Sequence, residues 1–425
     1  MTTTAAPTAS APPSSKHRLP ALDVLRGIAI LGTLLTNIWI FATPRNMASM
    51  SESELGAIAD GGVWANAFQT ALGLVTDGKF IGLLTIMFGI GLEIQRQSAL
   101  RRGETWPGRY PWRAGILVLD GLLNYIFIFE FDVLMGYGLT ALAVSAIMMT
   151  SPKAQKIWMI VGLAVHVAVI VGFDLLQSVF VFLGGVPTDI GDRASEAENA
   201  VGAAGPALDA MGSGSTDSYW AMVHERLITF VGGRAEIPIM FLMGIGLFLV
   251  GAHLYRAGIF EERGRQLRRR IMLLSFGIGL PLDWTLRLFL SDYTGGITRY
   301  ITSSLVAFGI LALVAQFYVR RGSTGVVGTG LSAVGKMALT CYILQNLIAS
   351  IIFYDWGFGM AGRIQGEYAV WLTMLIYLGI AGFLVALSLV WQRYFKRGPV
   401  EWLWHATYDG IGTVLDRRRA RVSAG

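Results

Sequence analysis

Residues Leu22–Ile38 read LDVLRGIAILGTLLTNI, an apolar run close to membrane length that starts with an ionisable pair and ends near an amide. Asp23 and Arg26 are three positions apart and therefore share one face of a helix. Asn37 follows about three turns later, roughly 16 Å further along that face. Polar side chains in a spanning helix are costly and indicate a functional site by default. The stretch thus predicts a first membrane helix with a polar stripe.

Simpler interpretations of the same residues stay open. Asp23 could cap a helix that begins after Pro20, and Arg26 could anchor this helix at the lipid headgroups. Asn37 could hydrogen-bond a neighbouring helix, since amides commonly join spans in this way.

The composition of the chain also indicates a membrane protein. Of its 425 residues, 54% are hydrophobic and only 15% are charged, which is too apolar for a soluble globular protein. The net charge of +6 comes from short basic clusters between apolar runs. This pattern is typical of cytoplasmic loops, so no nucleic-acid partner is expected. Cys341 is the single cysteine, which excludes an intrachain disulfide.

Apolar runs of about twenty residues mark the predicted spans. We expect an all-α, polytopic transmembrane helix bundle of about ten spans in the lipid bilayer, arranged as two halves of about five. The predicted spans are 21–43, 77–95, 112–129, 132–150, 157–182, 236–255, 270–290, 299–319, 336–354 and 368–391.

Basic connections alternate with acidic or neutral ones along these spans. The connection after the sixth span carries six arginines between Arg256 and Arg270, whereas the one after the fifth carries acidic residues such as Asp189 and Glu196. Since basic loops stay in the cytoplasm, both termini are predicted to be cytoplasmic. The expected parts are a disordered tail at 1–17, a membrane half at 18–183, an extracytoplasmic linker at 184–218, a second membrane half at 219–392 and a basic tail at 393–425.

Two amphipathic stretches, Val63–Val75 and Tyr219–Val231, precede the second and sixth spans. We expect them at the outer membrane face, either in the interface or folded over a cavity. The segments Met87–Ile94 and Leu242–Leu249 resemble each other, which suggests a duplication of the halves. Their shared Gly-Ile-Gly-Leu is equally typical of helix packing.

Carboxylates gather after the third span, where Glu130 and Asp132 follow Asn124. Two partly desolvated carboxylates this close repel each other, which raises the pKa of one and suits general acid or base catalysis. Alternatively, both face water at a helix turn. His224 on the second amphipathic stretch is a further candidate base, with an exposed interfacial role as its alternative.

Two other patterns have a structural interpretation. Asp283 and Arg287 are four positions apart and predict a stabilising ion pair within one helix. The spacing of histidines, cysteines and carboxylates does not resemble a metal site, so none is expected.

Four motifs together resemble the bacterial YeiB-like membrane proteins. They are LDVLRGIAILGTLLTNI at Leu22–Ile38, FDVLMGYGLTAL at Phe131–Leu142, VGKMALTCYILQNLI at Val334–Ile348 and GPVEWLWHATY at Gly398–Tyr408. The resemblance covers most of the chain and implies a location in the bacterial inner membrane. It also makes Tyr137 and Gln345, within the second and third motifs, candidates for substrate binding. In this sequence Asn124 stands where YeiB-like sequences often have His, and Cys341 and Asn346 replace the usual Asn and Ser.

The YeiB-like proteins are similar to a transmembrane acyltransferase superfamily that includes heparan-alpha-glucosaminide N-acetyltransferase and bacterial polysaccharide acetylases. The resemblance implies transfer of an acyl group from cytoplasmic acyl-CoA, as a co-substrate, to an envelope sugar or lipid, with no bound cofactor. In the polysaccharide acetylases an Arg in the first span is followed eleven positions later by a His. Arg26 matches this Arg, and Asn37 stands at the His position, as in the heparan enzyme.

The resemblance gives these residues expected roles. Arg26, beside Asp23, is expected at the cytoplasmic mouth, because a guanidinium fork suits the phosphates or carbonyl of the donor. Asn37 is not a base and would orient the acceptor or donate to a developing oxyanion. The base is then Asp132, Glu130 or His224.

Two other functions stay open. A lipid or small-molecule transporter or flippase without chemistry also suits two five-span halves with a polar midline. A catalytically silent membrane subunit suits the scarcity of histidine. The large apolar surfaces and the outer amphipathic stretches predict a homodimer.

Overall fold

The computed structural model describes residues 19–42, 62–182, 218–234, 236–321, 323–364, 366 and 368–423. Within these ranges the chain forms helices joined by turns and contains no strand, so the predicted all-α fold is confirmed. The predicted tail at 1–17, and all but the last residue of the predicted linker at 184–218, lie outside the described residues.

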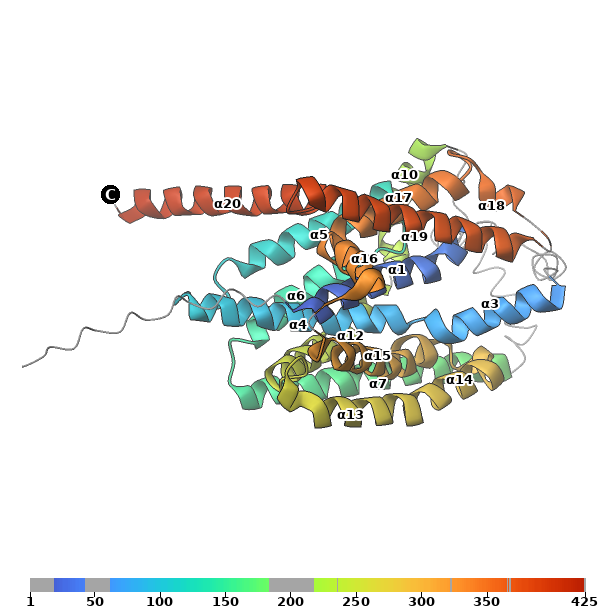
Figure 1. The fold of residues 1–425 in the computed structure, drawn as a ribbon, viewed down its shortest axis with the longest axis horizontal. Coiled ribbons are helices and arrows are strands. Elements are labelled where there is room, and N and C mark those ends of the chain that lie inside the picture. Colours follow the sequence, from blue (N-terminus) through green and yellow to red (C-terminus); the bar gives the residue numbers. More distant parts are fainter. Residues whose placement is uncertain are drawn as a thin grey trace, which may run out of the picture.

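Most of the helices run along one common long axis (Figure 1). They are α1 Pro20–Ala42, α3 Gly62–Thr76, α4 Lys79–Arg101, α5 Tyr110–Phe127, α6 Leu134–Ile147, α7 Pro152–Phe182, α10 Tyr219–Ile228, α11 Phe230–Gly233, α12 Glu236–Arg256, α13 Arg265–Leu274, α14 Leu280–Phe289, α15 Ser303–Val319, α16 Gly325–Lys336, α17 Ala338–Phe353, α18 Met360–Arg363, α19 Ala369–Tyr394 and α20 Pro399–Ser423. Short helical turns occur at Glu262–Gly264 and Ser291–Tyr293, and π-helical turns at Ser275–Gly279 and Ile297–Thr302.

The chain is a multi-pass membrane protein. Seven helices in the described ranges are long and apolar enough to cross a membrane. The pair α16 and α17, bent by 87°, adds an eighth span if both helices form one. The predicted count of about ten is not confirmed: α5, the predicted span 112–129, is not among these helices, and α6 has only 14 residues. At 1.5 Å per residue it is about 21 Å long, less than the roughly 30 Å of a hydrocarbon core.

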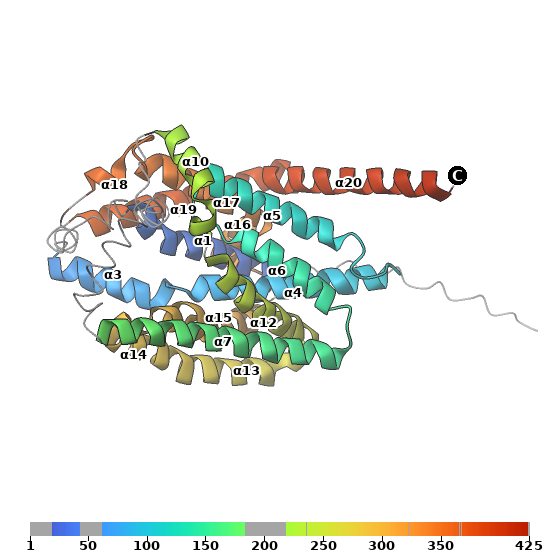
Figure 2. The same ribbon diagram turned by 180° about the vertical axis from the view of Figure 1, so that it is seen from behind.

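We name the two ends of the bundle after residues of α1. The Arg26 end holds the start of α1, the connection between α4 and α5, and α20, which extends beyond the other helices there (Figures 1 and 2). The Phe41 end holds the other end of α1. There the ring of Phe41 stacks on Phe129, 4.3 Å between centroids, in the turn between α5 and α6.

Buried apolar side chains form two clusters. The first is built mainly from α4, α6, α12 and α15, and the second from α1, α17 and α19 together with Phe129 and Leu134. Both clusters combine helices from the two predicted halves. The first also includes residues of Met87–Ile94 and Leu242–Leu249, so the two similar segments pack against each other.

Glycines allow the closest helix contacts. A Cβ atom at Gly335 of α16 would overlap the backbone oxygen of Asp23, and one at Gly27 of α1 would overlap the backbone of Leu331. Helices α1 and α16 therefore touch backbone to backbone. This contact holds the start of α17 next to Arg26.

Candidate functional site

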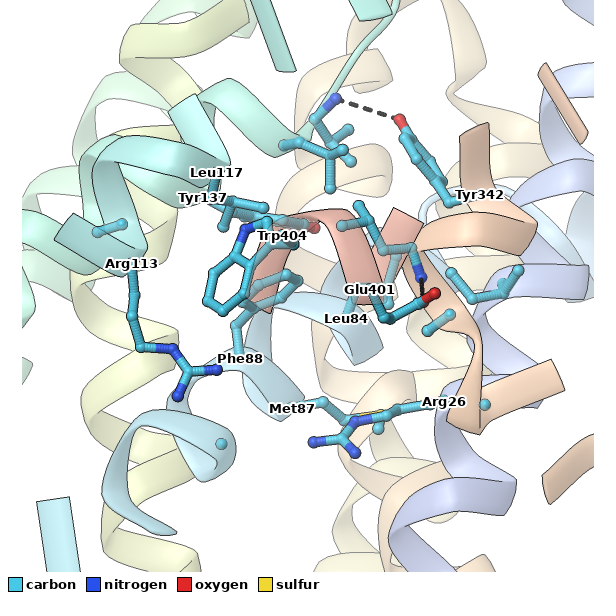
Figure 3. Close-up of a pocket in the computed structure, with 18 of the residues that line it drawn as sticks. Arg26, Leu84, Met87, Phe88, Arg113, Leu117, Tyr137, Tyr342, Glu401 and Trp404 are labelled. Atoms are coloured by element: carbon cyan, nitrogen blue, oxygen red, sulfur yellow. Dashed lines mark hydrogen bonds between the residues drawn. The ribbon is translucent and has the colours of Figure 1, made fainter. Parts of the chain in front are cut away.

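A cavity of about 330 Å³ lies between α1, α4, α5, α6, α17 and α20 at the Arg26 end (Figure 3). Most of its wall is apolar and is formed by Ile30, Leu84, Met87, Phe88, Ala114, Leu117, Val133, Leu134, Ala338 and Leu339. Four basic side chains also line it, namely Arg26, Arg113, Lys336 and His405. The cavity thus combines an apolar interior with positive charge.

Arg26 lies beside Asp23, as their spacing predicts. Its guanidinium lies 3.5 Å from the carboxylate of Asp23, and the two residues share one face of α1. The Arg26 side chain is 37% exposed, whereas that of Asp23 is buried. Arg26 and Arg113 point into the cavity from opposite sides (Figure 3). Both can therefore meet a ligand there.

Helix α20 forms one wall of this cavity. Glu401 accepts hydrogen bonds from the backbone N–H groups of Leu339, at 2.8 Å, and Thr340, at 3.1 Å, and from the Thr340 hydroxyl. The first amides of a helix lack intrahelical partners, so Glu401 acts as the N-terminal cap of α17. The fourth sequence motif therefore has a structural role that its residues alone did not reveal.

A cation–π contact holds α20 against α5. The Arg113 guanidinium lies over the Trp404 ring, 4.6 Å from its centroid, and 5.4 Å from that of Tyr408. In the part of the chain that the structure describes, no hydrogen-bond acceptor contacts Arg113. Its N–H groups are thus open to a ligand in the cavity. The sequence did not single out Arg113 or Trp404: Trp404 lies in the Trp-rich fourth motif, whereas Arg113 lies outside all four motifs.

Asp132 lies in the turn between α5 and α6, behind the cavity. Its Oδ1 accepts a hydrogen bond from Asn124 Nδ2 at 2.9 Å, and its Oδ2 accepts one from the backbone N–H of Met135 at 3.1 Å. The nearest Nη atom of Arg234 is 3.9 Å from Oδ2. Asn124 and Asp132 are both buried. The structure therefore brings these two predicted residues together.

Glu130 does not share a site with Asp132. Its carboxylate forms an ion pair with Arg226 at 2.5 Å and accepts a hydrogen bond from the Tyr354 hydroxyl at 3.2 Å. The expectation of two repelling carboxylates is wrong, because each of them faces its own arginine. His224 is exposed on α10, whose buried face carries Arg226, and it takes no part in this cluster.

Three further candidates have separate positions. Tyr137 is buried in the cavity wall, where its hydroxyl donates to the Ile81 backbone oxygen and accepts from Thr85, both at 3.1 Å. Gln345 is buried outside the cavity and donates to the Thr33 hydroxyl at 3.4 Å. Asn37 is half-buried on α1 and does not line the cavity either. This cavity therefore does not join Arg26 to Asn37.

Comparisons with known proteins give the family context of this site. Residues 254–410 match a family described as a protein of unknown function, DUF418. The chain is 29% identical to the uncharacterized protein YeiB of Escherichia coli strain K12, over 94% of this chain and 99% of the relative. It is 27% identical to the uncharacterized protein YxaH of Bacillus subtilis strain 168, over 93% and 96%. No solved structure shows a significant match.

Proposed function

Because the chain is a YeiB-like membrane protein, we propose that it is an integral-membrane acyltransferase, which moves an acyl group from acyl-CoA to an envelope sugar or lipid. Its relatives are themselves uncharacterized, so the proposal depends on the geometry of the site. The observation that carries it is a cavity with basic side chains and an apolar interior that ends beside a buried carboxylate.

The cavity matches the chemistry of an acyl-CoA. This donor combines phosphates with an apolar acyl group. Guanidinium groups bind phosphate in bidentate geometry, so Arg26 and Arg113 would hold the anionic part. The apolar wall around Leu84 and Leu117 would take the acyl group. Basic clusters gather at the Arg26 end, which would make it the cytoplasmic side of the inner membrane, where acyl-CoA is found.

Asp132 is the best-placed general base of the three candidates. Glu130 is held in its ion pair with Arg226, and His224 faces away from the cluster. Asp132 would be the final acceptor of the proton that an acceptor hydroxyl or amine loses as it attacks the thioester carbonyl. Breaking the C–S bond then releases the thiol of CoA. Asn124 would orient the carboxylate through its hydrogen bond.

A transporter or flippase remains the second candidate. The bent pair α16 and α17 lies beside the cavity, and discontinuous helices at a substrate site are typical of transporters. Such a protein would move its substrate between leaflets without changing it.

The test uses purified protein in nanodiscs with radiolabelled acetyl-CoA and an envelope extract. We expect label in the extract or release of thiol. Loss of a hydrogen bond to a charged ligand costs about 1.5–3 kcal/mol, so Arg26→Ala should lower the rate by roughly 10- to 100-fold. Arg101→Ala is the matched control, since Arg101 is exposed at the end of α4 and outside the cavity. Intact acetyl-CoA, together with movement of labelled lipid between leaflets of proteoliposomes, would support the transporter instead.

A further inference from the structure

Tyr342 connects the cavity to Asp132. It lies on α17, lines the cavity and is 2% exposed. Its hydroxyl is 3.4 Å from Asp132 Oδ1. It also accepts a hydrogen bond, 3.4 Å long, from the backbone N–H of Val133 (Figure 3). Asp132 itself does not line the cavity. Among the described side chains that do, Tyr342 is the one whose polar atom contacts the Asp132 carboxylate.

We propose that Tyr342 relays a proton between the reacting acceptor and Asp132, an inference that rests on the proposed acyl transfer. Asp132 lies behind the cavity wall, whereas general-base catalysis needs hydrogen-bond contact with the proton that is removed, either directly or through one water. A phenol both donates and accepts. Tyr342 can therefore receive a proton on one side while it gives one up on the other.

The step balances without a further reactant. The acceptor oxygen attacks the thioester carbonyl and forms the new C–O bond, while its proton passes to the Tyr342 oxygen and the Tyr342 proton passes to Asp132 Oδ1. When the C–S bond breaks, the proton returns from Asp132 through Tyr342 to the leaving sulfur. The products are the acylated acceptor and a free thiol, and both residues regain their starting states. The Val133 N–H would stabilise negative charge on the phenol oxygen as the protons move.

Two other polar side chains that line the cavity have different partners. The Tyr137 hydroxyl is engaged by Ile81 and Thr85, and Glu401 accepts from the first amides of α17. Asn124 donates to the same oxygen of Asp132 as Tyr342 does, which fixes the carboxylate in place. The geometry thus leaves Tyr342 as the route between cavity and base.

The experiment compares Tyr342→Phe with wild type in nanodiscs, with acetyl-CoA as the probe, water or an envelope extract as the acceptor and thiol release as the readout. General acid–base groups typically contribute 10²–10⁴-fold, so we expect thiol release to fall by roughly that factor. Binding of unreactive CoA should be unchanged. Tyr377→Phe is the matched control and should keep its rate, because the Tyr377 hydroxyl contacts the Leu31 backbone oxygen outside the cavity.

A proton inventory in mixtures of H₂O and D₂O separates a relay from a packing role. Two protons move together in the relay, so the wild-type rate should depend on the deuterium fraction along a curve. A linear dependence in wild type overturns the relay even if Tyr342→Phe does not fold. If Tyr342→Phe releases thiol at the wild-type rate, the relay is overturned but the acyltransferase is not. Wild type that binds CoA but leaves acetyl-CoA intact, with water or an envelope extract as acceptor, overturns the acyltransferase and the relay together.

Discussion

Lys79 and Asp283 form an ion pair, 2.5 Å between Nζ and Oδ2, in which both side chains are completely buried. The pair joins the start of α4 to α14, and Asp283 also contacts Arg287 at 3.2 Å. Removing one partner of a buried pair costs up to about 3–5 kcal/mol, and without Lys79 the buried Asp283 keeps Arg287 as its charged partner. We expect Lys79→Met to lower the melting temperature of the protein in detergent, measured by light scattering and tryptophan fluorescence.

The control for this variant is Lys153→Met, because Lys153 is exposed at the start of α7. Combining Lys79→Met with Asp283→Asn should recover part of the lost stability, since the buried charge disappears as well. If Lys79→Met has the same melting temperature as wild type, the pair does not stabilise the fold.

Gly335→Ala should destabilise the contact between α1 and α16. The added Cβ atom would meet the backbone oxygen of Asp23, which is not the end of a flexible side chain and cannot move aside. Overpacking of this kind typically costs about 1–3 kcal/mol. The melting temperature in detergent measures the effect. Gly379→Ala on α19 is the matched control, because no atom lies within 4 Å of its added Cβ; equal melting of the two variants would exclude tight packing at Gly335.

The fold class could be predicted from the sequence, whereas the number of spans could not. Apolar runs of membrane length are sufficient to indicate spanning helices, and α1, α7, α12 and α19 lie where such runs predict them. Hydropathy does not report where a helix ends or bends. The predicted span 132–150 corresponds to the short helix α6, and the bend between α16 and α17 falls inside an apolar stretch.

Parts of the candidate site could be predicted because they are local. Arg26 and Asp23 share a helix face, and Asn124 and Asp132 are eight positions apart, so short-range spacing indicates both contacts. The link between Tyr342 and Asp132 joins residues 210 positions apart. Helix packing alone creates such contacts, and periodicity within one helix carries no information about them. Asp283 and Arg287 were predicted as a pair because they are four positions apart on one helix, whereas Lys79 was missed because it is distant in the sequence.

Glu401→Ala should loosen α20 without unfolding the bundle. The variant removes the acceptor of the Leu339 and Thr340 amides, and loss of such a cap costs about 0.5–2 kcal/mol. We expect faster hydrogen–deuterium exchange at the first turn of α17 and faster proteolysis of α20. Glu262→Ala, at an exposed turn before α13, should change neither. Unaltered exchange in Glu401→Ala would show that α20 is held by other contacts.

The docking of α20 should weaken in acid through His405. Burial, with the positive charges of Arg397 and Arg113, lowers the pKa of His405 below its ordinary value of about 6.5, although Asp409 opposes this shift. A lowered pKa means that docking favours the neutral imidazole. Docking is therefore undiminished at pH values above the ordinary pKa and weakens as the pH falls through the lowered pKa of His405.

The measurement is hydrogen–deuterium exchange of the first α17 amides between pH 7 and pH 5, corrected for the intrinsic rate. Exchange should become faster at low pH in wild type and stay constant in His405→Gln. The control is His253→Gln, because His253 is exposed on α12; this variant should retain the wild-type response. If exchange in His405→Gln still rises in acid, another group is responsible for the acid sensitivity.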